Sequence, residues 1–170
     1  MLATEWGGIK IEGRNSEINS NEIYLNNNYG ILLGKGTSFF NCKIIGNHIH
    51  KNLGGGIIIC GFWDGVGKNI EISNNNIKFN IGVGIKLIHT ISSTIENNNI
   101  CYNMINAKFI NSFGNKWDEN YWSPLHRIIK IVIGAIKPFY GFPAPLIGRF
   151  FIPMINIDWN PAQEPYDIEV

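Results

Sequence analysis

Asn21-Glu-Ile23-Tyr-Leu-Asn26 is the first of five copies of one phrase, Asn-x-Ile-x-x-Asn, around which the chain is organised. The others are Asn47-His-Ile49-His-Lys-Asn52, Asn75-Asn-Ile77-Lys-Phe-Asn80, Asn98-Asn-Ile100-Cys-Tyr-Asn103 and Asn115-Lys-Trp117-Asp-Glu-Asn120. Their starts lie 26, 28, 23 and 17 residues apart, close to the repeat lengths that build solenoids. Because a unit this short cannot enclose its own core, each copy is expected to stack on the next.

A second phrase, Gly followed by alternating apolar residues, follows four copies of the first phrase at a nearly constant spacing. It occurs as Gly8-Ile9-x-Ile11, Gly30-Ile31-x-Leu33, Gly56-Ile57-x-Ile59 and Gly84-Ile85-x-Leu87, with a weaker copy at Asn106-Ala107-x-Phe109. From the first Asn of each phrase to the apolar residue after the Gly, the spacing is 10, 10, 10 and 9 residues, whereas the return arc varies. The period of two indicates strands, and length variation confined to one arc places the loops on one face.

Stacking in this register predicts inward columns of apolar side chains. One column contains Ile23, Ile49, Ile77, Ile100 and Trp117, and another contains Ile18, Ile44, Ile72 and Ile95. Burying a large aliphatic side chain contributes roughly 1.5–3 kcal/mol, so these columns are the expected driving force. The repeat asparagines are expected at the bends, where Asn tolerates the left-handed region and where stacked amides can bond coil to coil. They are Asn21, Asn47, Asn75, Asn98 and Asn115.

At this point the chain resembles a known family. From about residue 7 to residue 122 the two phrases are similar to the repeats of NosD-type and pectin-lyase-like proteins. The stretch from Asn115 to Trp122 resembles the closing motif of secreted NosD-like repeat proteins, and Asp158-Trp-Asn-Pro-Ala162 with Glu164-Pro-Tyr-Asp167 resembles the tail that follows it. The resemblance implies an all-β fold, a right-handed parallel β-helix (solenoid) of about five coils with a Pro-rich C-terminal capping segment. It also implies an extracellular or cell-surface location.

Two regions are expected. Residues 1–122 would form the parallel β-helix repeats, and residues 123–170 a C-terminal cap or tail that packs on the solenoid. The second region is strongly apolar but is interrupted by prolines and cations, and no run reaches the ~18 uncharged residues of a spanning helix. No transmembrane segment is therefore predicted, and an interfacial membrane anchor at Arg149-Phe-Phe-Ile is the alternative to a cap.

The start of the chain carries two further expectations. No signal peptide is recognised, because the first residues have neither a basic start nor an apolar core. Gly8 enters the repeat without a capping element before it. We therefore expect that further coils of a longer, exported chain precede Gly8 and stack on the first coil.

Composition argues against several partners. The net charge is +1 and charged residues make up 16% of the chain, and the scattered lysines form no basic stripe, so no nucleic-acid partner is predicted. No cofactor is predicted either. Cys42, Cys60 and Cys101 fall in three different columns, so stacking implies no disulfide among them and they are expected to be small apolar fillers.

His48-Ile49-His50 has a spacing of two histidines that is typical of metal ligands. In a strand both imidazoles point outward on one side, with Glu22 as a candidate third ligand. Lys78 is the expected column neighbour of His50, and a cation works against metal binding. The predicted metal site is therefore none, with His48, His50 and Glu22 as the weak alternative, even though a NosD-like resemblance implies copper handling.

The same stacking register also indicates which side chains could act on or bind a carbohydrate. Lyases and hydrolases on this fold need clustered acids, and no two Asp or Glu residues are expected on adjacent coils, so no catalytic residue is predicted. Lys86 and Lys108 are expected to stack in one outward column, where they could bind an acidic sugar. Trp63 and Asp64, in the long insertion of residues 61–68, are the other candidate carbohydrate contacts.

Three functions remain. The first is a non-catalytic exported or cell-surface module, carbohydrate-binding or structural, with a polysaccharide or cell-envelope glycan as partner. The second is the non-catalytic end of a larger carbohydrate-active enzyme whose catalytic coils lie upstream. The third is a NosD-type accessory factor for copper-site maturation. An enzymatic activity of this chain alone is not expected.

Overall fold

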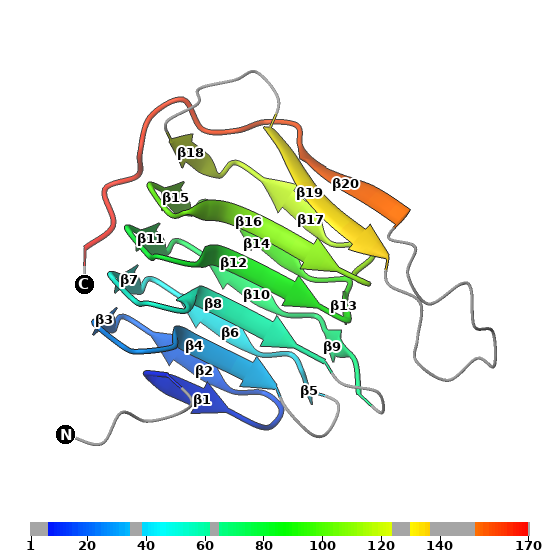
Figure 1. Ribbon diagram of the computed structural model, residues 1–170, viewed down its shortest axis with the longest axis horizontal. Coiled ribbons are helices and arrows are strands. Elements are labelled where there is room, and N and C mark those ends of the chain that lie inside the picture. Colours follow the sequence, from blue (N-terminus) through cyan, green and yellow to red (C-terminus); the bar gives the residue numbers. More distant parts are fainter. Residues whose placement is uncertain (1–6, 35–38, 62–64, 124–129, 137–151, 170) are drawn as a thin grey trace.

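The described part of the chain is built from strands and turns. The structure is a computed structural model that describes residues 7–34, 39–61, 65–123, 130–136 and 152–169. Its strands from successive coils stack in order along one axis, from β1 at one end to β17 and β18 at the other (Figure 1). The pairing between coils is parallel, which confirms the prediction of an all-β parallel β-helix. The number of coils and the capping role of the tail remain predictions.

Each wall of the solenoid contributes one strand per coil. The first wall contains β1 (Ile9–Ile11), β4 (Tyr29–Gly34), β8 (Gly55–Cys60), β12 (Val83–Ile88) and β16 (Ile105–Ile110). The second contains β2 (Glu17–Asn19), β6 (Lys43–Ile45), β10 (Glu71–Ser73), β14 (Thr94–Glu96) and β17 (Lys116–Asp118). The third contains β3 (Glu22–Tyr24), β7 (His48–His50), β11 (Asn76–Lys78), β15 (Asn99–Cys101) and β18 (Tyr121–Ser123). A short fourth sheet contains β5 (Phe39–Phe40), β9 (Gly67–Lys68) and β13 (Thr90–Ile91).

The isoleucine columns lie where the repeat places them, except at the last coil. Ile23, Ile49, Ile77 and Ile100 are paired in register on the third wall, and all four are buried. Trp117 does not continue this column, because it pairs with Ile95 on the second wall. The residue that pairs with Ile100 is Trp122. The fifth copy therefore begins at Asn120, five residues after the start at Asn115 that the sequence predicts.

The repeat asparagines form a hydrogen-bonded ladder inside the solenoid. The backbone N and Nδ2 of Asn21 both donate to Oδ1 of Asn47, each at 3.0 Å. The same two bonds run from Asn47 to Asn75, from Asn75 to Asn98 and from Asn98 to Asn120. Asn120, and not Asn115, is thus the fifth member of this ladder. The buried amides have partners above and below, as buried polar groups require.

A second ladder runs parallel to the first, and it explains why the Gly phrase travels with the Asn phrase. Its members are Asn26, Asn52, Asn80 and Asn103. A Cβ atom at Gly84 would lie 2.7 Å from Nδ2 of Asn103, and a Cβ atom at Gly8 or Gly30 would lie 2.7 or 2.9 Å from the ladder amide beside it. The glycine is required because a side chain there would occupy the space of the amide.

The left-handed residue at each corner is the one before the ladder Asn. Leu25, Lys51, Phe79 and Tyr102 have φ between 54 and 56°, whereas the ladder asparagines that follow them do not have positive φ. The expectation that Asn is used for its own left-handed tolerance is therefore wrong for the ladder positions. A left-handed non-glycine residue costs roughly 1–2 kcal/mol, and the ladder bonds next to it hold the corner in this conformation.

An antiparallel hairpin joins two walls at the C-terminal end. Its strands β19 (Lys130–Ile136) and β20 (Ile152–Asp158) pair with each other, while β19 also pairs with β16 and β20 with β17. The first and second walls thus become one continuous twelve-stranded sheet. Val132 is buried in the main core and Met154 packs against it. Within the described residues, no helix is long and apolar enough to span a membrane.

Candidate functional site

Lys86 and Lys108 lie side by side on the outside of the first wall. This is the register that the sequence predicts for the two lysines, the candidate contacts of an acidic sugar. They are Cα partners in β12 and β16, so their backbones are about 4.8 Å apart. The column continues downward as Ile58, Leu32 and Lys10, which confirms the expected stacking. Trp63 and Asp64, the other candidate glycan contacts, lie outside the described residues.

A groove lies beside Lys108 where β16 and β19 separate. The two strands pair only at Phe109–Gly134 and Ile110–Ala135. Below these pairs the space between them is about 480 Å³ and is lined by Met104, Ile105, Lys108, Lys130, Ile131 and Ile133 among others. Its walls are mainly apolar and its charged side chains are lysines. The sequence did not predict this groove, because it depends on where β19 lies.

The two histidines of the weak metal alternative are engaged by different partners. Nε2 of His48 contacts the backbone oxygen of Ile168 in the tail. Nε2 of His50 lies 3.3 Å from Oε1 of Glu22, and its ring stacks on Tyr24 with the ring centroids 5.3 Å apart. Lys78 is the register partner of His50, as expected. Within the described residues no group of three His, Cys, Asp or Glu side chains could hold a metal ion.

Two carboxylates do fall on adjacent coils, contrary to the expectation from the sequence. Glu96 and Asp118 are Cα partners in β14 and β17, because the five-residue correction of the last coil brings Asp118 beside Glu96. Nζ of Lys116 lies 2.8 Å from Oδ2 of Asp118 and this contact raises the pKa of the lysine. In the next column, Lys43 forms an ion pair of 2.9 Å with Glu71, and the hydrogen bond lowers the pKa of Glu71. On this wall Asp118 and Glu71 are thus each paired with a lysine.

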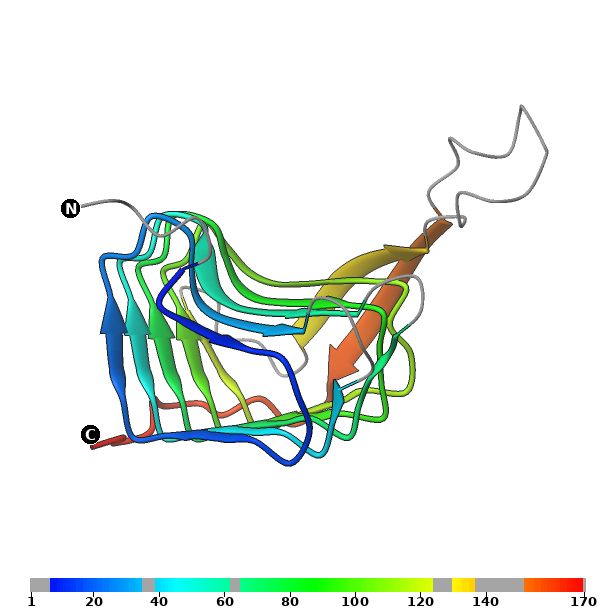
Figure 2. The ribbon, with the colours of Figure 1, turned by 90° about the horizontal axis from the view of Figure 1, so that it is seen from below.

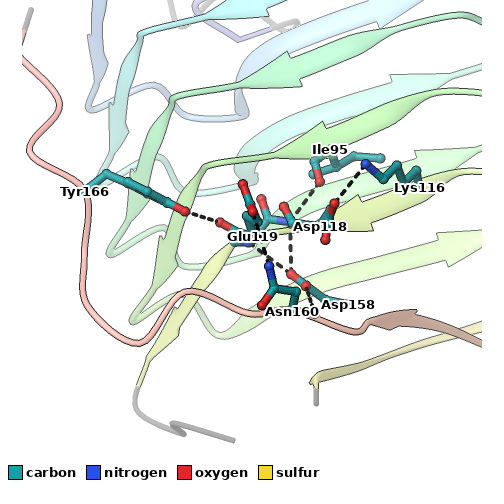
Figure 3. Close-up of polar contacts among 8 residues, drawn as sticks. Ile95, Lys116, Asp118, Glu119, Asp158, Asn160 and Tyr166 are labelled. Atoms are coloured by element: carbon teal, nitrogen blue, oxygen red, sulfur yellow. Dashed lines mark hydrogen bonds and ion pairs between the residues drawn. The ribbon is translucent and has the colours of Figure 1, made fainter. Parts of the chain in front are cut away.

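The closing motif and the tail motif bind each other, as Figure 3 shows. Oδ2 of Asp158 accepts hydrogen bonds from the backbone N and Nδ2 of Asn120, both at 3.1 Å, and from Nε1 of Trp122 at 2.9 Å. Asn160 donates to the carboxylate of Glu119 at 3.2 Å, and the hydroxyl of Tyr166 donates to the backbone oxygen of Glu119 at 2.7 Å. Burial is the main cause that raises the pKa of Tyr166, and Glu119 adds to it. These residues connect two parts of the chain and thereby fix the tail on the last coil.

Each ladder ends on a side chain that takes the place of a further Asn. Asp158 does this above Asn120. In the second ladder, the backbone N and Nδ2 of Asn103 donate to Oδ1 of Asn106 at 3.3 and 3.4 Å. Asn106 stands where earlier coils have the phrase glycine, so its departure from Gly was the signal in the sequence that the second ladder stops there.

Beyond Asp158 the tail crosses the third wall toward earlier coils. Ala162 forms a bridge with Tyr121, Tyr166 exchanges two hydrogen bonds of 2.8 Å with the Asn99 side chain, and Ile168 reaches His48. These contacts fit the expectation that the tail runs back along the solenoid.

A family model described as "Periplasmic copper-binding protein (NosD)" matches residues 2–127. The chain belongs to the NosD family. The match covers the repeat region that carries both ladders, and the description of the family as periplasmic indicates an extracellular or envelope location for this NosD member. No curated protein and no solved structure gives a significant match.

The described residues of this NosD chain do not fit a copper ion. Copper sites in proteins use imidazole and sulfur ligands in a converging set. His48 and His50 have other partners, and the buried Cys101 lies on the third wall with its thiol pKa raised by burial, which disfavours the thiolate that binds metal.

Proposed function

We propose that this chain is a non-catalytic β-helix module of the cell envelope. The observation that supports this role best is that both amide ladders end on side chains of the same chain, Asn106 and Asp158. Parallel coils tied in this way form a rigid stem that presents its outer walls to other molecules. Family membership supports the envelope location.

Turnover of polysaccharides tests the non-catalytic role. The purified protein is incubated with neutral and acidic polysaccharides, and released products are measured. We expect no products. Because Glu96 and Asp118 are the adjacent acids of the second wall, the matched variant is Glu96→Gln/Asp118→Asn. Products that disappear in this variant would overturn the proposal and favour the end of a larger carbohydrate-active enzyme.

A specific observation favours acidic polysaccharide as the ligand of the module. Lys86 and Lys108 are register partners on an outer wall, and two like charges on adjacent strands repel each other. An anionic sugar placed between them would relieve this repulsion. The proposal is therefore that an acidic glycan binds along the Lys86–Lys108 column.

Titration with an acidic and a neutral polysaccharide tests the ligand. We expect binding of the acidic polymer only, weakened about tenfold in Lys86→Gln/Lys108→Gln, because surface cation contacts each contribute about 1 kcal/mol or less. The matched control is Lys51→Gln/Lys68→Gln, which removes two exposed lysines elsewhere. Equal weakening by both double variants would show only a general charge effect and would contradict the site.

Copper-site maturation is the competing proposal, favoured by the family description. Copper titration followed by spectroscopy tests it. Since the ring nitrogens of His48 and His50 have other partners, we expect no stoichiometric copper binding at these residues. Stoichiometric binding that is lost in His48→Ala would favour the competing proposal.

A further inference from the structure

The β19–β20 hairpin carries an exposed apolar face. Ile133 pairs with Ile155 and Ile131 with Ile157 across its two strands, and alternate residues of a strand point to the same side. Ile133 is 66% exposed and Ile155 is 57% exposed. These four isoleucines are called the hairpin face. Lone apolar side chains on a surface need no explanation, but a contiguous set indicates an interaction site.

The hairpin face continues into the groove beside β16. Ile131 and Ile133 line this groove together with Met104 and Ile105. Met104 is 78% exposed. The apolar surface thus includes residues from β19, β20 and the start of β16, which are distant in sequence.

The tip of the hairpin is apolar on both sides. Ile152 points to the opposite side of β20 from Ile155, toward the side on which Met154 packs against the core. Nevertheless Ile152 is exposed, because the hairpin extends beyond the solenoid walls (Figure 2). Ile136 pairs with Ile152 at this end of the two described strands.

Among the described residues, the charged side chains that line the groove are lysines. No Asp or Glu occurs in the sequence between Glu119 and Asp158. Lys108 and Lys130 line the groove itself. A second copy packed face to face would bring the Lys108 and Lys130 side chains of both copies close together, which like charges oppose. An anionic surface that also accepts apolar side chains fits both features.

We propose that the hairpin face docks the protein on a lipid bilayer that contains anionic lipids. The isoleucines and Met104 would enter the boundary between headgroups and acyl chains, while Lys108 and Lys130 would lie at the negatively charged headgroups. The backbones of β19 and β20 pair with each other along their described length, so these two strands can approach the lipid with their ladder groups satisfied. This inference goes beyond the proposed function, since it concerns how the module is held and not what its walls bind.

Vesicle flotation of the purified full chain tests this inference. One set of vesicles contains phosphatidylcholine alone and the other contains phosphatidylglycerol as well. The test variant is Ile133→Thr/Ile155→Thr, which keeps β-branched side chains on the strands. The control is Ile81→Thr, because Ile81 is 59% exposed at a solenoid corner. Melting temperatures of all variants are compared to establish folding, and Ile131→Thr is a second test variant.

We expect the wild type and Ile81→Thr to float only with vesicles that contain phosphatidylglycerol, and added salt to weaken this binding. The hairpin variants should bind at least about tenfold more weakly, because large apolar side chains no longer enter the lipid. Absence of wild-type binding, equal binding of all variants, or equal binding to both kinds of vesicle would overturn the proposal. Self-association that is lost in Ile133→Thr/Ile155→Thr, without vesicle binding, would assign the face to a second copy instead. Glycan binding measured on the same variants separates this result from the proposed function.

Discussion

Asp158 occupies the place of a sixth amide above Asn120. Its Oδ2 lies 3.1 Å from both the backbone N and Nδ2 of Asn120, the two donors that each earlier ladder Asn directs at the next. Asp158 is fully buried, and its Oδ1 accepts a further bond from the backbone N of Asn160 at 3.3 Å. A residue far along the chain thus completes the inner ladder of the repeats.

Two substitutions at Asp158 distinguish the effect of its hydrogen-bond acceptor from the effect of its charge on stability. Asp158→Asn keeps an oxygen that can accept from Asn120 and Trp122, so we expect a loss of only about 1 kcal/mol in the free energy of unfolding. Asp158→Leu leaves buried donors without acceptors, and we expect a loss of about 3 kcal/mol or more. Denaturant unfolding measures both. Equal losses in the two variants would contradict the ladder role.

The two inward tryptophans of the last coil should respond differently to Phe. Nε1 of Trp122 donates to Asp158 at 2.9 Å, whereas the buried Nε1 of Trp117 has no hydrogen-bond partner among the described residues. Trp122→Phe should therefore lose roughly 1.5–3 kcal/mol more stability than Trp117→Phe, the value of a hydrogen bond to a charged group. Thermal and denaturant unfolding of both variants check this, and a larger loss in Trp117→Phe would refute it.

Much of the solenoid could be predicted because its residues repeat in register. The columns through Ile23 and Ile18, and the pairing of Lys86 with Lys108, follow from the constant arc between Asn and Gly. The last coil was misplaced because Asn115-x-Trp117 and Asn120-x-Trp122 both fit the start of the phrase. The distance from Asn98 settles the register, since Asn120 lies 22 residues on, close to the earlier spacing, and Asn115 only 17.

The contacts of the C-terminal region could not be predicted in the same way. Asp158, Asn160 and Tyr166 lie outside the repeat, so no spacing relates them to Asn120 or Glu119. Their partners depend on the path of the intervening chain. The acid pair Glu96–Asp118 was missed for a different reason, because it lies within the repeat and the register error of the last coil moved Asp118 away from β14. Sequence reasoning thus succeeded where the repeat spacing is unambiguous. It failed at the last coil, where two registers fit the phrase, and where the neighbours depend on the path of the returning chain.

Gly84 should be intolerant of a side chain. A Cβ atom there would lie 2.5 Å from the backbone oxygen of Asn106 and 2.7 Å from Nδ2 of Asn103. We expect Gly84→Ala to lower the free energy of unfolding by about 1–3 kcal/mol, the usual range for overpacking. Gly13→Ala is the control, because its Cβ would meet nothing closer than 3.8 Å. Similar stabilities of the two variants would mean that the ladder amide moves aside easily.

His89 should make the protein less stable in acid. Burial lowers the pKa of His89 below its ordinary value of about 6.5, and its Nε2 lies 3.1 Å from Nδ2 of Asn111. Because the unfolded chain then binds the proton first, the stability due to neutral His89 is complete above about pH 6.5 and is lost as the pH falls through the folded-state pKa.

The matched variant for this effect is His89→Asn, since residue 89 has φ of 50° and Asn tolerates that conformation. Denaturant midpoints measured at about pH 7.5 and about pH 5 should differ less for the variant than for the wild type. An unchanged pH dependence would show that His89 does not cause the loss.

Removing the C-terminal region should expose the end of the solenoid. A chain that ends at Trp122 lacks β19, β20 and Asp158, so the donors of Asn120 and the edges of β16 and β17 lose their partners. Unpaired strand edges beside an open apolar core promote aggregation, and we expect this chain to aggregate or to melt well below the parent. A chain that ends at Gln163 is the control, because it keeps the hairpin, Asp158 and the bridge at Ala162 but loses the contacts of Tyr166 and Ile168. We expect the control to stay monomeric, as measured by light scattering. If the chain that ends at Trp122 also stays monomeric with an unchanged melting temperature, residues 123–170 are not a cap.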